Sequence, residues 1–526
     1  MFSRRHRFTA LAVLGLCTAI GAPLVAQSPD EVPAGPLTLE QVLTLAEKRS
    51  ESIAIARAAV QRAEGEQTRA RSGLYPQLSA SASYDRALAS EFEGLFDSTD
   101  FGGAEEDGSF EDLPFGRENT WRVSFALSQN LYTGGRQAAQ NRIAEAGREA
   151  ASLGVSTSRG QLLFDVTQAY YDAALSDRLV QIAEATREQA DATLRQTQAG
   201  FDAGTQPEFE LVRARVTRDT QTPLVIRQRA NREVALLRLK QLLDLPQDFD
   251  LQLADALGDE RLSPPATFAA SVAPFEKSLP VTDPAALTAA ARADIAIPDR
   301  TVVNEAAATL RLREASLKLA EAQKKPQIAL NSTYSRIAYP SNFFPAFDRS
   351  NWSVGAALNI PVLTGGRQRG DEQVARAELE QARLQLRQTQ ELAALDSRSA
   401  WAELIAARAA WEASAGTVQQ AARAHEIADV RYRAGVSTQL ELSDARLLLQ
   451  QAEANRAQAA RDLQVARARM ALLPDLPIGA SSTPRLQVPP QQVPPAPQPS
   501  PGLPGGSNAA IQTGGFQTGG FQAGIR

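Results

Sequence analysis

Side-chain polarity alternates with a period of two along four short stretches of the chain. Each stretch places an apolar residue at every second position and mostly polar residues, often serine, between them. The apolar positions are Leu78, Ala80, Ala82 and Tyr84; Trp121, Val123, Phe125 and Leu127; Ile328, Leu330 and Tyr334; and Trp352, Val354, Ala356, Leu358 and Ile360. This period predicts four β-strands, each with one apolar face. Lengths of about ten to thirteen residues suit tilted strands that cross a membrane.

Two longer stretches, residues 137–199 and 368–433, have the composition of helices. They contain no proline, and alanine, glutamine, arginine, glutamate and leucine dominate. In the second stretch, Ala375, Leu379 and Ala382 follow a spacing of four and three. Some sixty residues at about 1.5 Å each predict helices roughly 95–100 Å long. Because the apolar positions are largely alanine, we expect these helices to pack closely against other helices.

Each long helix is predicted to end at a glycine and to reverse direction. The sequence from Ala203 to Pro207 offers a helix-ending glycine, a capping threonine and an early helical proline. The residues around Gly435 repeat this arrangement before Thr438. Pro223 should kink the helix that returns from the first turn. The remaining helices are expected over about residues 39–72, 207–244, 300–325 and 438–472.

The chain contains an internal two-fold repeat. The pentapeptide Thr-Gly-Gly-Arg-Gln at residues 133–137 recurs at residues 364–368, 231 positions later. The same offset maps Trp121 onto Trp352 and the Ala-Gly pair at 203–204 onto the pair at 434–435. Landmarks that keep one register over about 80 residues indicate two copies of one unit. We expect a first structural repeat at residues 37–244, an irregular link at 245–299 and a second repeat at 300–473.

Both ends of the chain differ from the repeats. Residues 1–26 carry three arginines, a short apolar run and the small residue Ala26, a pattern typical of a secretory signal peptide. Residues 474–526 are rich in proline, glycine and glutamine and are predicted to be disordered. Within the first repeat, ten acidic residues against one arginine between positions 91 and 118 predict a solvated loop, with cation binding as the alternative.

Composition excludes several classes of function. Cys17, the only cysteine, lies in the predicted signal peptide, in a run that resembles a lipidation site except for the bulky Leu16 before it. Cleavage after Ala26 leaves one histidine, His425, so the chain cannot assemble a metal cluster or a nucleophile–histidine–acid set. We therefore expect no metal, no cofactor and no catalytic residue. The mature net charge of −8 (52 basic minus 60 acidic residues) argues against nucleic acid as a partner.

Four strands in one chain cannot close a barrel, and an open sheet edge is not tolerated in lipid. No segment after the signal offers the apolar run that a membrane-spanning helix needs. Several chains must therefore contribute strands to one barrel. Three chains would give twelve strands, an even number within the range of outer-membrane barrels. The long helices of these chains would then line up as a tube.

The order of elements and several motifs resemble the TolC-like outer membrane factors, the exit ducts of efflux pumps and type I secretion systems. The matching motifs are Leu-Tyr-Thr-Gly-Gly-Arg at 131–136, Pro-Val-Leu-Thr-Gly-Gly-Arg at 361–367, and Arg-Tyr-Arg-Ala-Gly at 431–435 followed by Leu440 and Asp444. The likeness covers about residues 37–473. It implies a mixed α and β membrane protein, a homotrimer whose twelve-stranded outer-membrane β-barrel (four strands per chain) continues as a long periplasmic α-helical barrel. It also implies contact with outer-membrane lipid, a periplasmic membrane-fusion adaptor and an inner-membrane pump.

The resemblance further implies where such a duct closes, because the family places carboxylates on the return helices just past the tip glycines. The implied periplasmic gate residues are Glu441, Asp444, Glu210 and Tyr432. Glu441 and Asp444 lie three residues apart on one helix face, where rings of carboxylates would favour cations. The alternatives are that these two are solvated helix residues, and that Tyr432 and its repeat equivalent Phe201 are core residues. Ser437 stands where the family often has a basic residue.

Two more residue sets follow from the resemblance. The implied adaptor-docking tip comprises Ala203, Gly204, Ala434 and Gly435, and the strand-to-helix junctions comprise Gly134, Gly135, Gly365 and Gly366. We predict a passive outer-membrane exit duct, not an enzyme, of a tripartite efflux pump or type I secretion system. An adaptor would open it at its periplasmic helical tip. The alternative is a periplasmic coiled-coil adaptor or scaffold protein, which would not need the four alternating stretches.

Overall fold

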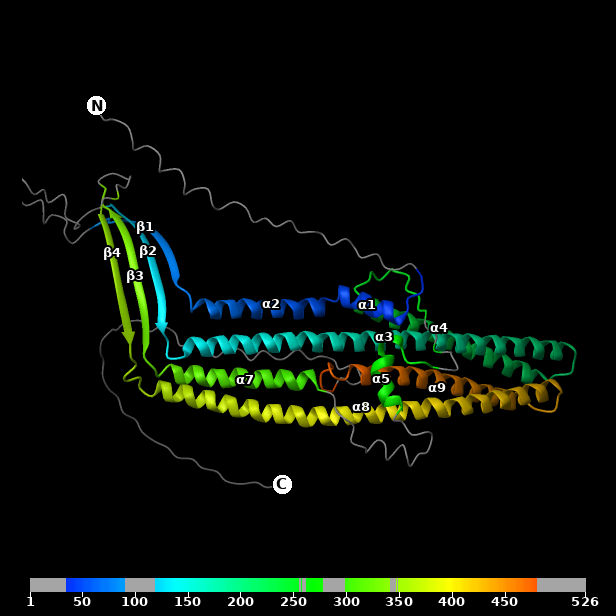
Figure 1. The fold of residues 1–526 in the computed structure, drawn as a ribbon. Helices are drawn as coiled ribbons and strands as arrows, with labels where there is room; N and C mark the ends of the chain where they lie inside the picture. The colour runs from blue at the N-terminus through cyan, green and yellow to red at the C-terminus, as the bar shows by residue number, and fades with distance from the viewer. Residues whose placement is uncertain are drawn as a thin grey trace, which may run out of the picture. The chain divides into compact units, whose positions relative to one another are not determined.

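The computed structural model describes residues 35–89, 119–254, 257, 262–277, 299–340, 347 and 349–479 (Figure 1). The predicted signal peptide, the acidic stretch at 91–118 and the tail from residue 480 onward lie outside these residues. The helices are α1 (Leu39–Arg49), α2 (Glu51–Ser72), α3 (Arg136–Asp202), α4 (Glu208–Leu242), α5 (Ala266–Lys277), α7 (Thr301–Ala322), α8 (Arg367–Arg433) and α9 (Gln439–Leu472). The strands are β1 (Gln77–Arg86), β2 (Asn119–Tyr132), β3 (Gln327–Ala338) and β4 (Arg349–Asn359).

The four strands form one antiparallel sheet in the order β1-β2-β3-β4. Its register brings the alternating apolar residues of all strands onto one face, since Ala80 pairs with Phe125, Phe125 with Tyr334, and Tyr334 with Trp352. A shift of one residue in any pairing would move that strand's apolar set to the other face. The strands predicted from the polarity period are therefore confirmed, and their cross-strand apolar pairs fix the register.

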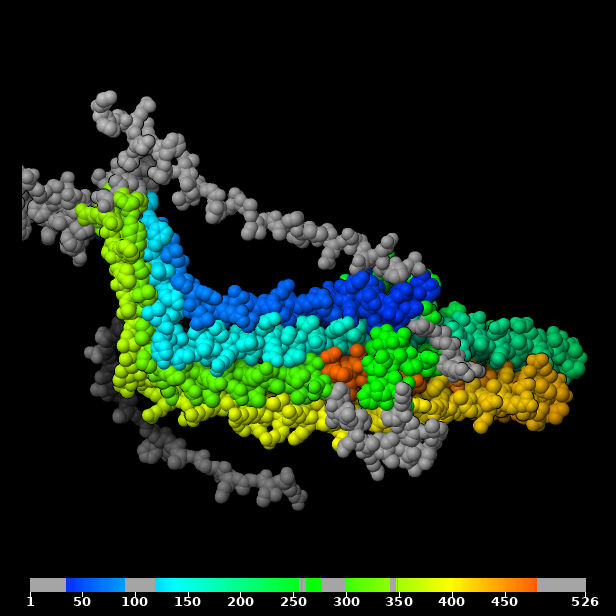
Figure 2. Space-filling model, viewed as in Figure 1, coloured from blue at the N-terminus to red at the C-terminus, as the bar shows by residue number. Residues whose placement is uncertain are grey.

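The helices form one layer built around two long members, α3 and α8, of 67 residues each. Near the sheet, α2 packs on α3, α3 on α7, and α7 on α8, as Figure 2 shows in adjacent bands of colour. Farther from the sheet, α4 packs on α3, and α9 packs on both α3 and α8. Two shorter helices thus follow one another along each long partner. None of the described helices is long and apolar enough to cross a membrane.

The sequences of the two repeats align with two different offsets. Helix α7 and strand β3 begin 250 positions after α2 and β1 (Thr301 against Glu51, Gln327 against Gln77). Helices α8 and α9 begin 231 positions after α3 and α4 (Arg367 against Arg136, Gln439 against Glu208). The register therefore changes between the two strands of the hairpin, where the first repeat has the longer connection.

Two local features differ from the sequence-based expectations. The helix expected over 39–72 is divided at Ser50, whose hydroxyl accepts a hydrogen bond from the Ile53 amide and caps the start of α2. The link expected to be irregular contains helix α5. Pro223 lies inside α4, which continues on both sides of it, and the kink expected there stays a prediction.

Charged side chains are buried where the second repeat begins and the described chain ends. The Arg300 guanidinium donates to Asp396 Oδ2 at 2.9 Å and to the Leu476 carbonyl at 3.1 Å. Arg469 donates to the other oxygen of Asp396 at 2.8 Å. Asp396 is thus shared by two buried cations, of which Arg469 also pairs with Glu403, and such an arrangement is costly to break. Leu476 itself is buried, so the first residues of the predicted disordered tail belong to the packed structure.

Candidate functional site: the hairpin tips

Both helical hairpins reverse direction through the same turn. Gly204 and Gly435 adopt left-handed φ angles of 72° and 70°. In the first tip, the Gly204 amide donates to the Phe201 carbonyl and the Thr205 amide to the Gly200 carbonyl, at 2.9 and 2.8 Å. This pair of bonds is the Schellman motif, which satisfies carbonyls at the end of a helix. The equivalent bonds close α8 in the second tip.

The threonines of the two tips cap different helix ends: Thr205, expected as a capping residue, caps the end of α3, and Thr438 caps the start of α9. The Thr205 hydroxyl donates to the Gly200 carbonyl at 2.9 Å, so it completes the end of α3 and does not cap the start of α4. Helix α4 begins after Pro207, which has no side-chain acceptor. Thr438 occupies the position equivalent to Pro207, and its hydroxyl accepts from the Glu441 amide.

Tyr432 connects the two hairpins of the chain. Its ring is buried and packs with Ala428, Leu442 and Ala445 of α8 and α9. Its hydroxyl lies 3.0 Å from Thr197 Oγ1 of α3. The Thr197 hydroxyl already donates to the Thr193 carbonyl, so the tyrosine is the donor in this hydrogen bond, hereafter the tyrosine contact. The tyrosine therefore combines core packing with a hydrogen bond between hairpins.

Glu210 also takes part in a contact between hairpins. Gln439, at the start of α9, is buried. With its amide nitrogen turned towards α4, it donates to the Glu210 carbonyl at 3.1 Å and to the Glu210 carboxylate at 2.9 Å. This bond joins the first turns of the two return helices, and a charged acceptor makes it stronger than a neutral one.

Glu441 and Asp444 are both exposed on α9. The Glu441 carboxylate lies 3.2 Å from the Arg431 guanidinium, and both side chains are about half exposed. An ion pair of this exposure contributes about 0–1 kcal/mol, because water screens it. The predicted gate residues thus fall into two groups: Tyr432 and Glu210 hold the hairpins together, and Glu441 and Asp444 face solvent.

Arg446 was not among the predicted site residues. It is buried in α9, and its Nη2 donates to Thr193 Oγ1 of α3 at 2.9 Å. Burial lowers the pKa of Arg446, and the nearby Asp429 carboxylate partly offsets this. A sequence signal did exist, since Arg446 lies one helical turn after Leu442 and therefore on the buried face of α9.

At the other end of the long helices, the structure shows why the strand-to-helix junctions carry glycines and a glutamine. Gly134 and Gly135 have φ angles of 63° and 94°, and Gly365 and Gly366 have 59° and 88°. The glutamine that ends each motif then reaches back to the preceding short helix. Gln137 donates to the Ala70 carbonyl, and Gln368 donates to the Gln323 carbonyl. The pentapeptide thus turns the chain from strand to helix and ties the new helix to its neighbour.

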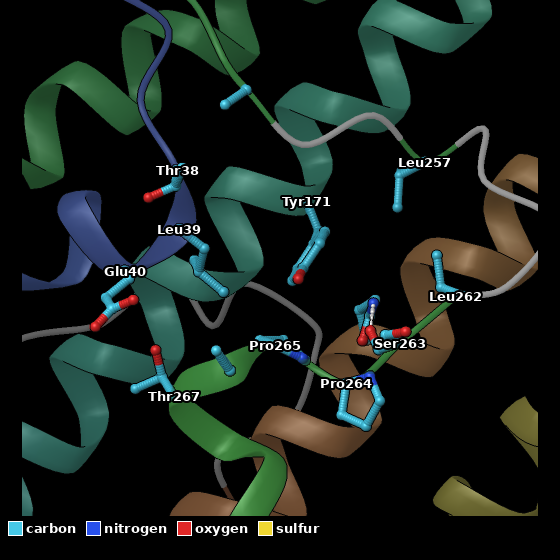
Figure 3. A pocket seen from close by; sticks show the side chains of 13 residues that line it. Thr38, Leu39, Glu40, Tyr171, Leu257, Leu262, Ser263, Pro264, Pro265 and Thr267 are labelled. Atoms are coloured by element: carbon cyan, nitrogen blue, oxygen red, sulfur yellow. Dashed lines mark hydrogen bonds between the residues drawn. The ribbon is translucent and has the colours of Figure 1, made fainter.

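A cavity of about 540 Å³ lies between the start of α1, the middle of α3 and the start of α5 (Figure 3). Glu40, Tyr171, Pro265 and Gln464 are among its lining residues. No predicted site residue lines it. Among the described residues, no group of three histidine, cysteine, aspartate or glutamate side chains could hold a metal ion.

The chain matches the outer membrane efflux protein family over residues 42–244 and 294–473. It is 27% identical over 430 residues to the pyoverdine export outer membrane protein OpmQ of Pseudomonas putida, covering 79% of this chain and 81% of that protein. Among solved structures it is similar to the outer membrane channel CmeC of Campylobacter jejuni, with a TM-score of 0.67, 16% identity, and coverage of 84% of this chain and 87% of that one.

Two further structures share the fold. One is VceC of Vibrio cholerae, with a TM-score of 0.64, 16% identity, and coverage of 82% of this chain and 95% of that one. The other is the open state of the MtrE channel of Neisseria gonorrhoeae, with a TM-score of 0.63, 19% identity, and coverage of 83% and 89%.

The chain belongs to the outer membrane efflux protein family. It is an exit duct of the outer membrane that extends into the periplasm, and its fold is that of the TolC-like channels. The predicted family, the TolC-like fold of the chain, its function as an outer-membrane exit duct and its location are therefore confirmed.

Proposed function

We propose that three copies of the chain close one twelve-stranded barrel in the outer membrane and continue as one periplasmic helical barrel. Among the described residues, β1 and β4 have no partner strand on their outer edges. Unpaired backbone groups at such edges are costly in contact with lipid, so each edge needs a strand from a neighbouring copy. The shared apolar face of the sheet supports contact with lipid.

The edges of the helix layer support the same assembly. Helices α4 and α8 bound the layer on the side of the tips, and both expose large apolar side chains. They are Phe209, Val212, Val216, Ile226 and Val234 on α4, and Val374, Leu384, Leu395, Ile427 and Val430 on α8. Rows of exposed apolar residues on a long helix favour burial against another helix. A neighbouring copy would bury both rows.

We propose that the gate lies at the tips. The contacts between the two hairpins must then break when the duct opens. The tyrosine contact and the Gln439–Glu210 bond hold the two hairpins of one chain together. Glu441 and Asp444 would line the constriction as rings of carboxylates, which favour cations. A periplasmic membrane-fusion adaptor docking on Ala203, Gly204, Ala434 and Gly435 would separate the hairpins and open the passive path.

The cargo would be delivered by an inner-membrane pump, which leaves the duct itself with no catalytic step. The name of the relative from Pseudomonas putida describes pyoverdine export, and it supports a role of this duct in export across the outer membrane. The observation that carries the proposal is the sheet with two unpaired edges joined to a tip held by polar contacts between hairpins.

The experiment has two arms. We expect outer membranes to yield a trimer that dissociates on heating, and recovery from the soluble periplasm would overturn the assembly. The double variant Glu441→Ala with Asp444→Ala should raise leakage of large antibiotics and weaken cation selectivity in planar bilayers. The matched control is Glu380→Ala, an exposed carboxylate of α8 distant from the tip. Unchanged selectivity in the double variant would overturn the assignment of the gate carboxylates.

A further inference from the structure

Besides the tyrosine contact and the Gln439–Glu210 bond, Arg446 joins the two hairpins at the tip. Arg446 Nη2 donates to Thr193 Oγ1 at 2.9 Å, and we name this bond the arginine contact. Arg446 is 9% exposed, and its Nε has no hydrogen-bond partner in the described part of the chain. A buried cation held by a hydroxyl instead of a carboxylate is poorly compensated. Small changes in local charge should therefore alter this contact strongly.

His425 lies ten residues before Gly435 in α8, and Arg446 lies eleven residues after it in α9, so the packed antiparallel helices bring both residues to the same level of the hairpin. Its Nε2 is buried and has no hydrogen-bond partner among the described residues. Burial lowers the pKa of His425, the Arg446 charge lowers it further, and Asp429 on the next turn of α8 acts in the opposite direction. Helix α3 presents the uncharged hydroxyls of Thr193 and Thr197 to this region. Within the part of the chain that the structure describes, the charged groups that shift the pKa of His425 are thus Arg446 of α9 and Asp429 of its own helix.

We propose that the arginine contact helps to hold the tip closed, and that protonation of His425 places a second positive charge beside Arg446 and weakens the contact. The closed tip would then loosen as the periplasm becomes acidic. This inference rests on the proposed function of the tip as the gate. Arg446 acts here as a positioning residue, because it holds α9 to α3 and does not contact cargo.

The direction of the pH effect follows from the lowered pKa. His425 titrates below its ordinary value of 6.5 in the packed tip, so the packed tip disfavours the charged ring. The stability that the neutral ring gives to the closed state is fully present above pH 6.5. It is lost as the pH falls from there towards the lowered pKa. The only other histidine is His6, within the predicted signal peptide, so no second histidine of the mature chain obscures this titration.

The test uses the purified full-length trimer in planar bilayers between pH 8 and pH 5.5. We expect the wild-type conductance to rise severalfold as the pH falls. His425→Gln should remain near its pH 8 conductance throughout, and Arg446→Met should already be raised at pH 8. Glu426→Gln, an exposed neighbour on α8 paired with Arg423, is the matched control and should follow the wild type. A His425→Gln profile equal to the wild type, or a normal Arg446→Met conductance at pH 8, would overturn the proposal.

A second readout does not depend on conductance. The nuclear magnetic resonance signal of the single histidine ring should titrate below pH 6.5 in the wild type and at a higher pH in Arg446→Met, because the repelling charge is gone. Equal midpoints in both proteins would overturn the coupling of His425 to Arg446. Failure to form any channel would refute the proposed function, while the ring titration would still decide whether the two residues are coupled.

Discussion

Tyr432 and Phe201 occupy equivalent positions in the two repeats, but their side chains have different surroundings. Tyr432 is buried and donates a hydrogen bond to Thr197. Phe201 is 38% exposed at the end of α3. The duplicated helix end therefore carries a connecting residue in one repeat and an exposed aromatic ring in the other. The same aromatic position therefore has a different role in each repeat: it connects the hairpins in the second and is exposed in the first.

Replacing Tyr432 with phenylalanine should loosen the closed tip without disturbing its packing. The ring that contacts Leu442 and Ala445 remains, and only the bond to Thr197 is lost. Thr197 keeps its bond to the Thr193 carbonyl, so we expect a cost near the ordinary value of about 1 kcal/mol, or about a fivefold shift towards the open state. Single-channel conductance at pH 8 measures this shift.

The control for this prediction is Phe201→Leu at the equivalent position of the first repeat. Its exposed side chain has no comparable hydrogen bond to lose, so the conductance should remain close to the wild-type value. If Tyr432→Phe also keeps the wild-type conductance, the hydroxyl contributes nothing to closure, and Tyr432 acts at the tip only as a core residue.

At the scale of elements, the two strand-to-helix junctions have the same sequence but different space around their first glycine. A Cβ atom at Gly134 would lie 2.5 Å from Lys325 Cβ and 3.2 Å from the Ala322 carbonyl oxygen. A Cβ atom at Gly365 would meet nothing within 4 Å among the described residues. Gly134 is close to the end of α7 because α3 packs between α2 and α7, whereas α8 lies at the edge of the layer.

This difference predicts unequal effects of one substitution at two equivalent positions. Both Gly134→Ala and Gly365→Ala suffer the left-handed backbone, which costs about 1–2 kcal/mol for a residue with a Cβ atom. Gly134→Ala must also displace Lys325, so it should reduce the yield of heat-dissociable trimer in outer membranes more than Gly365→Ala does. Gel electrophoresis of heated and unheated membranes gives both yields. Equal yields would show that the segment around Lys325 moves aside without a loss of stability.

Local sequence patterns predicted the elements well because the signals for strands, long helices and glycine turns lie within a few neighbouring residues. The tertiary contacts of the tip could not be predicted in the same way. Thr205 has the residue type of a cap, but the carbonyl that it satisfies belongs to the helix before it. The spacing of Arg446 from Leu442 indicates the buried face of α9, but its bond to Thr193 follows only from the packing of α9 against α3.

At the scale of the whole molecule, the two repeats leave complementary edges. The first repeat contributes β1 and the second contributes β4, and these are the outer strands of the described sheet. The connection between the strands of each hairpin can differ in length, as the offsets of 250 and 231 positions show, without altering the register of the sheet. Closure of a barrel therefore depends on the strands and not on their connecting loops.

Cysteine pairs across the proposed junction of β1 with β4 of a neighbouring copy test this closure directly. The mature chain has no cysteine if the signal is removed, so Ser81→Cys can be combined with one cysteine at a time over residues 351–357 of β4. Ser81 shares its face of the sheet with Ser124, Ser335 and Asn351 by register.

Successive side chains of a strand point to opposite faces, and a disulfide needs Cα atoms about 4.4–6.8 Å apart. Cross-links should therefore form at odd-numbered positions and fail at even-numbered ones, with Ala82→Cys showing the opposite pattern. The ladder of linked chains on denaturing gels should end at three copies, and a ladder without this alternation would contradict a shared barrel.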